Sequence, residues 1–316
     1  MACARRCYKK NNRESLTKLD MLITVFTPTY NRAQLLPRLH RSLQEQTNKD
    51  FEWVIVDDGS TDNTKEVIEN IIIQQENDFP IQYFYKENGG KHTAINQGVK
   101  EAKGELFFIA DSDDLLPNNS IEIVVNEFAK IKDKKEIGAI VGFDNFINKS
   151  NSITEFPFKT EECTFTEFGN KWRINQDMKE VFRTSVLKEI PFPEIENERF
   201  CPEDLEWLLI SHKYLFHYFD KFIYTAEYQE NGLSANITKI RMNSPILTTW
   251  TYAEYNEFNT SIYKKIRNAI NYWRFYFCIK DKSKIRKKIS PFWIGLFPIG
   301  WAFHIKDHIR IKKISN

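Results

Sequence analysis

Three carboxylates crowd together directly after a predicted strand. Asp111, Asp113 and Asp114 follow the apolar run Leu106–Ala110 in the stretch DSDD. Carboxylates this close repel one another unless a cation or solvent lies between them. A hard divalent ion such as Mg²⁺ or Mn²⁺ takes one or two carboxylates together with phosphate oxygens. The stretch indicates either a divalent-cation site or an acidic turn that caps the next helix, and acidic turns are common.

Two further strand ends carry polar or aromatic side chains. Asp57 and Asp58 follow the run Phe51–Val56, and the letters GSTD come next, which suit a tight turn and a helix cap. A carboxylate there can alternatively accept hydrogen bonds from a base or a ribose. In the loop TPTYNR, Tyr30 can stack on a flat base, although one aromatic loop residue is more often plain packing. His92, a lone histidine, is more often a hydrogen-bonding neighbour than a catalyst.

The elements that must position these residues alternate between strand and helix. This pattern predicts an α/β fold with a mostly parallel sheet covered by helices on both faces. Ligands of such sheets bind beyond the carboxyl ends of the strands, where the polar turns fall. The predicted strands are Leu22–Thr27, Phe51–Val56, Ile81–Tyr85 and Glu105–Ala110, and the predicted helices are Ala33–Gln46, Asp62–Ile73, Thr93–Ala102 and one that opens near Pro117.

The alternation weakens beyond residue 130. Ala139–Phe146 is a further predicted strand, Asp204–Tyr214 is a predicted helix, and Ile246–Lys288 has a helical, aromatic-rich pattern. Periodicity identifies these elements less securely than the first four strands, because short apolar runs fit either structure.

Charge is distributed unevenly along the 316 residues. The segment from Ser261 to the end holds 14 Lys and Arg against 2 Asp and Glu, a net charge of +12, whereas the preceding residues carry a net charge of −10. This asymmetry indicates an anionic partner for the C-terminal fifth, either nucleic acid or an acidic lipid surface. The five scattered cysteines form no paired zinc module, and the polar residues 1–20 contain no export signal, so we expect a reducing cytoplasm and an N-terminal tail.

Four motifs in order resemble a known family. TPTYNR, SLQEQT, FEWVIVDDGSTDNT and AINQGVKEAKGELFFIADSDD are similar to the nucleotide-sugar domain of glycosyltransferase family 2. The resemblance is strong over residues 22–120 and looser over 177–235. It implies a GT-A fold over residues 21–235. It also implies transfer of a sugar with inversion at the anomeric carbon. The residue pattern and the charge predict a helical, basic C-terminal region over residues 236–316.

The resemblance also implies roles at the ends of the early strands, for Thr27, Tyr30, Asp58, Lys91, Asp111 and Asp113. Thr27 and Tyr30 would contact the nucleotide, with the Tyr30 ring on the base, usually uracil. Asp58 would bind the edge of the base, and Lys91 would lie against the nucleotide. Asp111 would contact the ribose or the metal, and Asp113 would ligate the Mn²⁺ or Mg²⁺ that bridges the diphosphate. Asp114 would only cap the following helix.

A catalytic base is expected from the second half of the chain. Glu203-Asp204 resembles the ED motif of the family, and inversion needs a carboxylate that takes the proton of the attacking hydroxyl. Asp204 is the predicted base and Glu203 the alternative. Without the resemblance, a helix-capping role for the pair would be favoured. Asp177 is a weaker candidate for the acceptor site.

The C-terminal end predicts a membrane-surface segment. Lys280–Lys288 is basic, and the 17 residues of Ile289–Ile305 contain no Asp, Glu, Lys or Arg. Because crossing a bilayer takes about 20 apolar residues, a shallow interfacial segment fits this run better. A helix would place Trp293, Phe297 and Trp301 on one face. The alternative is a buried core helix with a basic rim.

These features together predict a metal-dependent, hexosyltransferase-like enzyme of surface-polysaccharide assembly. We expect a UDP-sugar donor, a glycan or lipid-linked acceptor and a peripheral position at the inner face of the plasma membrane, without nucleic acid. A nucleotide- or nucleic-acid-binding module is one alternative, but it leaves the acidic strand ends unexplained. A nucleotidyltransferase is another, but it should carry a Gly-rich basic loop after the first strand, and TPTYNR is not one.

Overall fold

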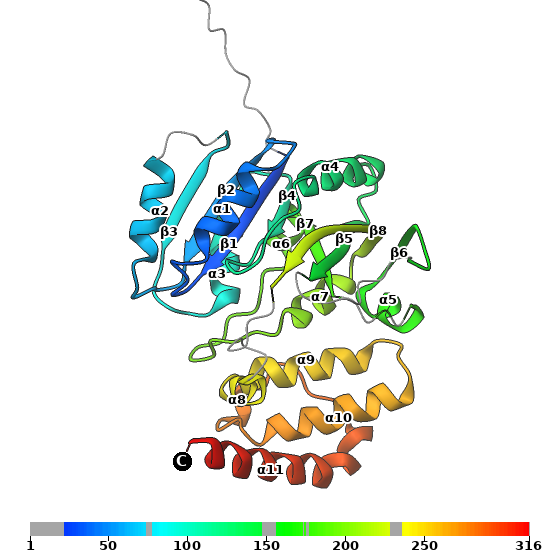
Figure 1. The fold of residues 1–316 in the computed structure, drawn as a ribbon. Coiled ribbons are helices and arrows are strands. Elements are labelled where there is room, and N and C mark those ends of the chain that lie inside the picture. The colour runs from blue at the N-terminus through cyan, green and yellow to red at the C-terminus, as the bar shows by residue number, and fades with distance from the viewer. Residues whose placement is uncertain are drawn as a thin grey trace, which may run out of the picture.

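A mixed sheet of eight strands forms the centre of the part of the chain that is described (Figure 1). The computed structural model describes residues 22–73, 78–146, 156–172, 174, 177–227 and 236–315, and the predicted tail over residues 1–20 lies outside them. The strand order is β3-β2-β1-β4-β7-β5-β8-β6.

The first four strands pair in parallel, as predicted. All residues of β1, β2 and β4 are buried, as expected for strands with helices on both faces. Parallel pairing brings the carboxyl ends of these strands to one edge of the sheet. The strands are β1 (Ile23–Thr29), β2 (Phe51–Asp57), β3 (Ile81–Tyr85) and β4 (Leu106–Ile109).

The other half of the sheet contains strands that the sequence analysis did not identify. Strand β7 (Met178–Arg183) runs antiparallel between β4 and β5 (Ile137–Phe146), and only β5 was predicted. Strand β8 (Leu215–Ala226) is parallel to β5, and β6 (Thr160–Cys163) is antiparallel to β8. Because β7 runs in the opposite direction, its first residues lie at the edge where β4 ends.

Helices cover both faces of the sheet. Apolar side chains of α1, α2 and α4 form one core with the sheet, and those of α3, α6 and α7 form a second core on the other face. The predicted α/β architecture is thereby confirmed. The helices are α1 (Leu36–Gln44), α2 (Thr64–Ile73), α3 (Lys91–Glu101), α4 (Ser120–Ile131), α5 (Phe165–Lys171), α6 (Thr184–Glu189) and α7 (Glu203–Ser211).

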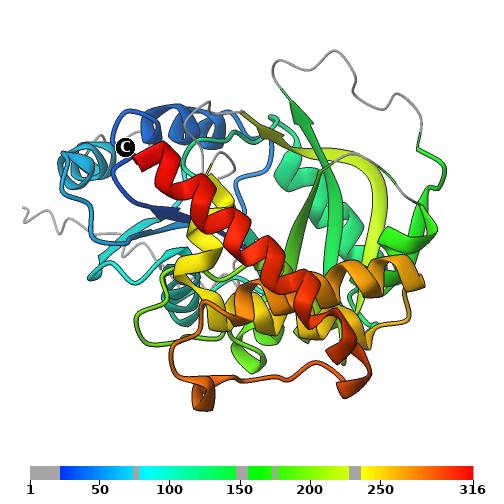
Figure 2. The same cartoon turned by 90° about the horizontal axis from the view of Figure 1, so that it is seen from below.

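The C-terminal region is helical and stacks in layers away from the sheet (Figures 1 and 2). Helix α9 packs on α7, α10 packs on α9, and α11 packs on α10. The helical character was predicted and is confirmed, whereas the domain boundary near residue 236 stays a prediction. The elements are α8 (Ile237–Asn243), α9 (Pro245–Glu257), α10 (Ile262–Tyr276), α11 (Phe297–Ser315) and the 3-10 helices η2 (Lys282–Lys284) and η3 (Pro291–Leu296).

The apolar C-terminal run is not one helix, so the predicted common face of Trp293 and Trp301 is wrong. Trp293 lies in η3, is half-buried, and its backbone carbonyl accepts a hydrogen bond from Trp273 Nε1 at 2.9 Å. The α-helix begins only at Phe297, and Trp301 is 52% exposed on it. A helical turn repeats every 3.6 residues only within one α-helix, and the 3-10 segment breaks that repeat. Among the described residues, no helix has the length and apolarity needed to cross a bilayer.

Candidate functional site

Two of the predicted polar loops are joined by hydrogen bonds at the carboxyl edge of the sheet. Asn31, which follows β1, donates its backbone N–H to Ser60 Oγ at 2.8 Å, and its Oδ1 accepts from the Thr61 N–H at 2.8 Å. Asn31 has a φ of 53°, a left-handed conformation that asparagine tolerates better than most residues. Tyr30 beside it is 48% exposed, so its ring is available at this edge.

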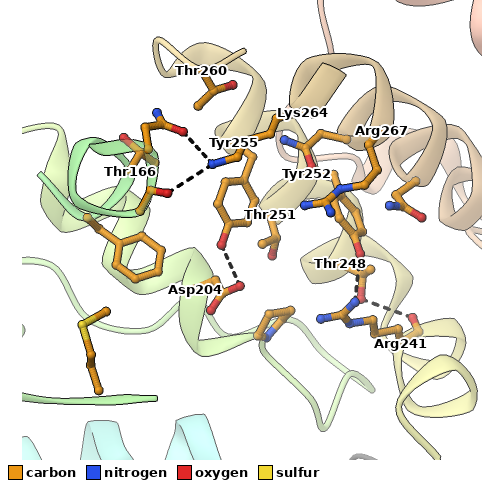
Figure 3. A pocket seen from close by; sticks show the side chains of 17 residues that line it. Thr166, Asp204, Arg241, Thr248, Thr251, Tyr252, Tyr255, Thr260, Lys264 and Arg267 are labelled. Atoms are coloured by element: carbon orange, nitrogen blue, oxygen red, sulfur yellow. Dashed lines mark hydrogen bonds between the residues drawn. The ribbon is translucent and has the colours of Figure 1, made fainter. Parts of the chain in front are cut away.

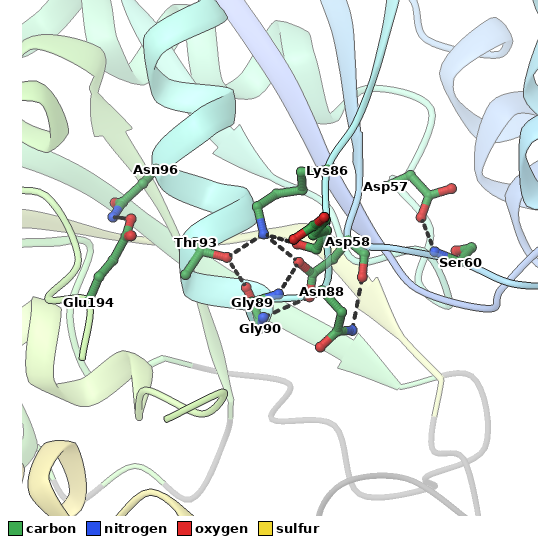
Figure 4. A network of polar contacts seen from close by, with 11 residues as sticks. Asp57, Asp58, Ser60, Lys86, Asn88, Gly89, Gly90, Thr93, Asn96 and Glu194 are labelled. Atoms are coloured by element: carbon green, nitrogen blue, oxygen red, sulfur yellow. Dashed lines mark hydrogen bonds and ion pairs between the residues drawn. The ribbon is translucent and has the colours of Figure 1, made fainter. Parts of the chain in front are cut away.

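Asp58 anchors the loop that leads into α3 (Figure 4). Its Oδ1 accepts from Lys86 Nζ at 2.8 Å and from the Gly89 N–H at 2.9 Å, and its Oδ2 accepts from the Gly90 N–H at 2.8 Å. Gly90 has a φ of 98°, and a Cβ there would lie 2.0 Å from the Arg199 carbonyl oxygen. Asp58 therefore fixes the start of α3, and its predicted contact with a base edge stays a prediction.

Two other residues from the sequence analysis point into the protein. Thr27 is fully buried, and its Oγ1 accepts from Trp53 Nε1 at 2.9 Å. His92 is also buried, and neither ring nitrogen has a hydrogen-bond partner within the described ranges. Burial lowers the pKa of His92, which favours a neutral ring. The contact of Thr27 with a nucleotide stays a prediction, and its hydroxyl oxygen already accepts the hydrogen bond from Trp53.

Lys91 connects the acidic strand end to the predicted catalytic pair. Its Nζ lies 2.6 Å from Asp111 Oδ1 and 2.6 Å from Glu203 Oε1. Burial opposes the charge on Lys91, but the two carboxylates outweigh it and raise its pKa. Burial likewise disfavours the charge on Asp111, but Lys91 and Lys179, which lies 3.7 Å from Asp111 Oδ2, hold its pKa at about 2. Asp111 is therefore ionised at neutral pH.

Two further carboxylates near this edge, those of Asp114 and Asp144, have raised pKa values. Burial and the charge of Asp111 raise the pKa of Asp114 to about 6, and burial raises that of Asp144 to about 7. Asp113 is partly exposed, and its Oδ2 lies 4.0 Å from Arg32 Nη2. Asp111 and Asp113 offer carboxylate oxygens, which are the ligands that a hard divalent cation takes. The residues present therefore fit a Mg²⁺ or Mn²⁺ ion.

Asp114 does not cap α4, so that expectation is wrong. Its Oδ1 accepts from the Glu227 N–H at 2.9 Å, and α4 begins six residues later at Ser120 with Asn119 as its N-cap residue. The contact links the acidic loop after β4 to the residue that follows β8. An isolated antiparallel β-bridge between Leu115 and Thr225 joins the same two segments.

The two adjacent acids at the start of α7 face different surroundings. Glu203 is paired with Lys91, whereas Asp204 Oδ2 accepts from Tyr255 Oη at 2.7 Å (Figure 3). Burial raises the pKa of Asp204, which makes its carboxylate a better proton acceptor than an exposed aspartate. Asp177 is exposed, and its backbone carbonyl accepts a hydrogen bond from the Asp144 N–H at 3.0 Å.

Asp204 lines a cavity of about 530 Å³ formed between α5, α7, α8, α9 and α10. Several residues at this cavity and at the sheet edge were missed by the sequence analysis. Tyr255 and the basic cavity residues belong to helices far along the chain, where no local motif marks them. Lys179 lies in the stretch around Asp177, and the antiparallel direction of β7 that places it was not predicted. These missed residues are Lys179, Arg241, Tyr255, Lys264 and Arg267.

Among the described residues, two side-chain groups place three possible metal ligands together, and both involve the C-terminal helices. In each, the possible ligand atoms lie within 4.8 Å of one another. In the second group, His212 Nε2 and Lys287 Nζ already bind Glu254 Oε2 at 2.9 and 2.8 Å. The sequence analysis searched for closely spaced cysteine pairs and did not find either group, because the members of each group are far apart along the chain. The groups are Cys278, His304 and His308, and His212, Glu254 and Glu257.

Comparison with known proteins identifies a family model and several relatives. The model of glycosyl transferase family 2 matches residues 24–190, more than half of the chain. Glycosyltransferase GlyG of Streptococcus pneumoniae is 30% identical over 189 residues, which cover 56% of this chain and 60% of that protein. An uncharacterized glycosyltransferase of Rickettsia typhi is 37% identical over 132 residues, 42% of this chain and 39% of that protein. The matched region thus spans less than two thirds of either relative.

Solved structures share the fold over most of the chain. S. aureus TarS 1-349 in complex with UDP-GlcNAc has a TM-score of 0.60 at 21% identity, covering 89% of this chain and 79% of that one. The mannosyltransferase PcManGT from Pyrobaculum calidifontis, in complex with GDP-Man and Mn²⁺, has a TM-score of 0.54 at 17% identity, covering 89% and 73%. At these identities the likeness establishes the GT-A fold.

Proposed function

The chain belongs to glycosyltransferase family 2, and from that premise we propose that it transfers a sugar, with inversion, from a nucleotide-sugar to an acceptor hydroxyl. The observation that carries the proposal is the chain of contacts from Asp111 through Lys91 to Glu203, next to Asp204. It brings an acidic strand end suited to a diphosphate and its metal together with a candidate base. We propose a UDP-sugar as the donor.

On the donor side, the residues of the sheet edge bind and orient the nucleotide. The exposed Tyr30 ring offers a stacking surface for the base. Asp58 holds the loop before α3 in place, and this orders the start of the helix that carries Lys91. Asp111 and Asp113 would hold Mn²⁺ or Mg²⁺. When bound, the ion offsets the charge that develops on the departing diphosphate.

In this proposal Lys91 also supplies positive charge to the bound diphosphate. Its ammonium group already neutralises Asp111, so a diphosphate bound at this edge would meet a cation as well as carboxylates. Lys179 adds a second ammonium group from β7. Favourable electrostatic contacts with a developing negative charge lower the barrier when they are in place before the reaction.

On the acceptor side, Asp204 is the proposed general base. As the acceptor oxygen attacks the anomeric carbon, its proton moves to the Asp204 carboxylate, and the bond between the anomeric carbon and the diphosphate oxygen breaks. The contacts favour Asp204 over Glu203, because the Glu203 carboxylate is already engaged by Lys91. Tyr255 orients the Asp204 carboxylate from α9.

We further propose that the enzyme works in surface-polysaccharide assembly at the inner face of the plasma membrane, on a glycan or lipid-linked acceptor. Support comes from η3 and the outermost helix, α11 (Figure 2). Large apolar side chains are exposed on both, and the flanking sequence is basic. Basic residues near anionic lipid contribute about 1 kcal/mol each. The exposed apolar residues are Phe292, Ile294, Phe297, Ile299, Trp301, Phe303, Ile305 and Ile309.

The test is release of a free nucleoside diphosphate from a panel of UDP- and GDP-sugars, with Mn²⁺ or Mg²⁺ and with excess chelator. We expect turnover of at least one UDP-sugar that chelation abolishes. Release of the sugar 1-phosphate instead, with the nucleoside monophosphate moved to another acceptor, would identify a nucleotidyltransferase. Binding of nucleotide without any turnover, in the presence of membranes as an acceptor source, would favour a binding module.

A further inference from the structure

We propose that the cavity beside Asp204 is an acceptor site selective for a phosphate ester that carries the attacking hydroxyl. The inference rests on the proposed function, since it takes Asp204 as the base. It goes further by assigning the chemical class of the acceptor and the residues that select it.

The charges that line the cavity are predominantly positive. Arg241 comes from α8, and Lys264 and Arg267 come from α10 (Figure 3). The single carboxylate among the described lining residues is Asp204. A neutral glycan needs no such set of cations, whereas an anionic group next to Asp204 does need them to offset repulsion.

Arg241 has hydrogen-bonding capacity left over. Its Nη1 donates to Tyr252 Oη at 2.8 Å, but its Nε is buried without a hydrogen-bond partner within the described ranges. Among the described residues, no carboxylate forms an ion pair with Arg241 or Arg267. A buried guanidinium N–H without a partner is costly, and a phosphate oxygen is the acceptor that arginine matches best.

The other lining groups suit the rest of a phosphorylated polyol or sugar. Thr260 Oγ1 is buried without a hydrogen-bond partner within the described ranges, and the Asn268 and Asn271 amides line the wall formed by α10. A volume of about 530 Å³ exceeds what one phosphate needs and is within the range of small-molecule sites. The phosphate is held by Arg241 and Arg267, so the hydroxyl of the same unit can approach Asp204.

The experiment is titration calorimetry with glycerol 3-phosphate as the probe. UDP and Mn²⁺ are present in excess, so that the nucleotide side is filled. Glycerol tests for binding without the phosphate, and glycerate tests a carboxylate in its place. We expect saturable binding of glycerol 3-phosphate alone. Arg267→Gln, at the exposed rim, should weaken it at least about tenfold, and the double variant with Arg241→Gln should weaken it further. Lys265→Gln, on the same helix outside the cavity lining, is the matched control and should leave it unchanged.

Three outcomes would overturn the inference: no saturable binding, binding that both arginine variants retain, or equal binding of glycerate. Thermal melting of each variant checks folding, and Arg267→Gln carries the test if the double variant unfolds. Donor turnover by the wild-type protein is measured separately. If turnover is present but the probe does not bind, this inference fails and the proposed function stands. If the probe binds but no nucleotide-sugar is turned over, the proposed function fails instead.

Discussion

Lys91 Nζ lies 2.6 Å from Glu203 Oε1, which joins the first turn of α3 to the first turn of α7. The same ammonium group also contacts Asp111, so one side chain links the end of β4 to the helix that carries the candidate base. This relationship gives the adjacent acids different properties. The Glu203 carboxylate is paired with Lys91, whereas the Asp204 carboxylate lines the cavity formed with α8, α9 and α10.

Replacing Lys91 by Gln should weaken donor binding and slow transfer. The change leaves Asp111 and Glu203 without their shared cation, so the two carboxylates repel each other and a bound diphosphate meets less positive charge. We expect kcat/KM for the nucleotide-sugar to fall at least about tenfold, measured by diphosphate release. Lys100→Gln, at the exposed end of the same helix, is the control. Equal effects of the two changes would contradict the role of Lys91.

Replacing Asp113 by Ala should remove the dependence on Mn²⁺ or Mg²⁺ together with donor turnover, while the fold stays intact. The side chain is partly exposed and makes only a 4.0 Å contact with Arg32, so its loss should leave the melting temperature nearly unchanged. The measurement is turnover across a Mn²⁺ titration, with exposed Asp133→Ala as the control. Full activity of wild-type enzyme in excess chelator would refute the metal requirement.

Replacing Asp204 by Asn should retain nucleotide-sugar binding and slow transfer by about two to four orders of magnitude, the scale of general acid-base catalysis. Asparagine keeps the shape of the side chain but cannot accept the proton. Binding is measured by calorimetry with the UDP-sugar, and transfer by single-turnover assay. If Glu203→Gln is inactive and Asp204→Asn is active, the base is Glu203.

Replacing Tyr255 by Phe should move the acid limb of the pH profile to higher pH. Burial already raises the pKa of Asp204, and the Tyr255 hydrogen bond opposes that rise by stabilising the carboxylate. Its loss should raise the pKa further. Because the base must be ionised, activity should then be lost at a higher pH as the solution is acidified. An unshifted profile of kcat/KM, with the exposed Tyr263→Phe as control, would count against Asp204 as the base.

The exposed face of α11 should bind anionic vesicles. Truncation after residue 288 is a poor test, because Ile289 is buried and Leu296 packs on α10 and its neighbours. The double change Trp301→Ser and Ile305→Ser removes exposed apolar area instead. We expect weaker cosedimentation with phosphatidylglycerol vesicles and unchanged melting. Ile72→Ser with Ile73→Ser, on exposed positions of α2, is the matched control. No binding by the wild-type protein would refute the membrane role.

The sequence by itself determined the parallel half of the sheet and the loops that follow its strands. Runs such as Phe51–Val56 are buried on both faces, so their apolar letters mark strands directly, and acids such as Asp58 and Asp111 stand immediately after them. Parallel pairing then places these strand ends together without further information. The family resemblance drew on the same local patterns and is confirmed by the family match.

Only the tertiary structure decided how these residues are connected. Lys91 and Glu203 are more than 100 residues apart, and no local pattern encodes a contact between the starts of two helices. Likewise, Tyr255 and Arg241 reach the neighbourhood of Asp204 because α9 packs on α7, and β7 presents Lys179 because it runs antiparallel to β4. Periodicity reports which face of an element is buried, but the partner of each face is chosen by packing of the whole chain. The polar edge of the sheet could therefore be predicted from the sequence, and the cavity beside Asp204 could not.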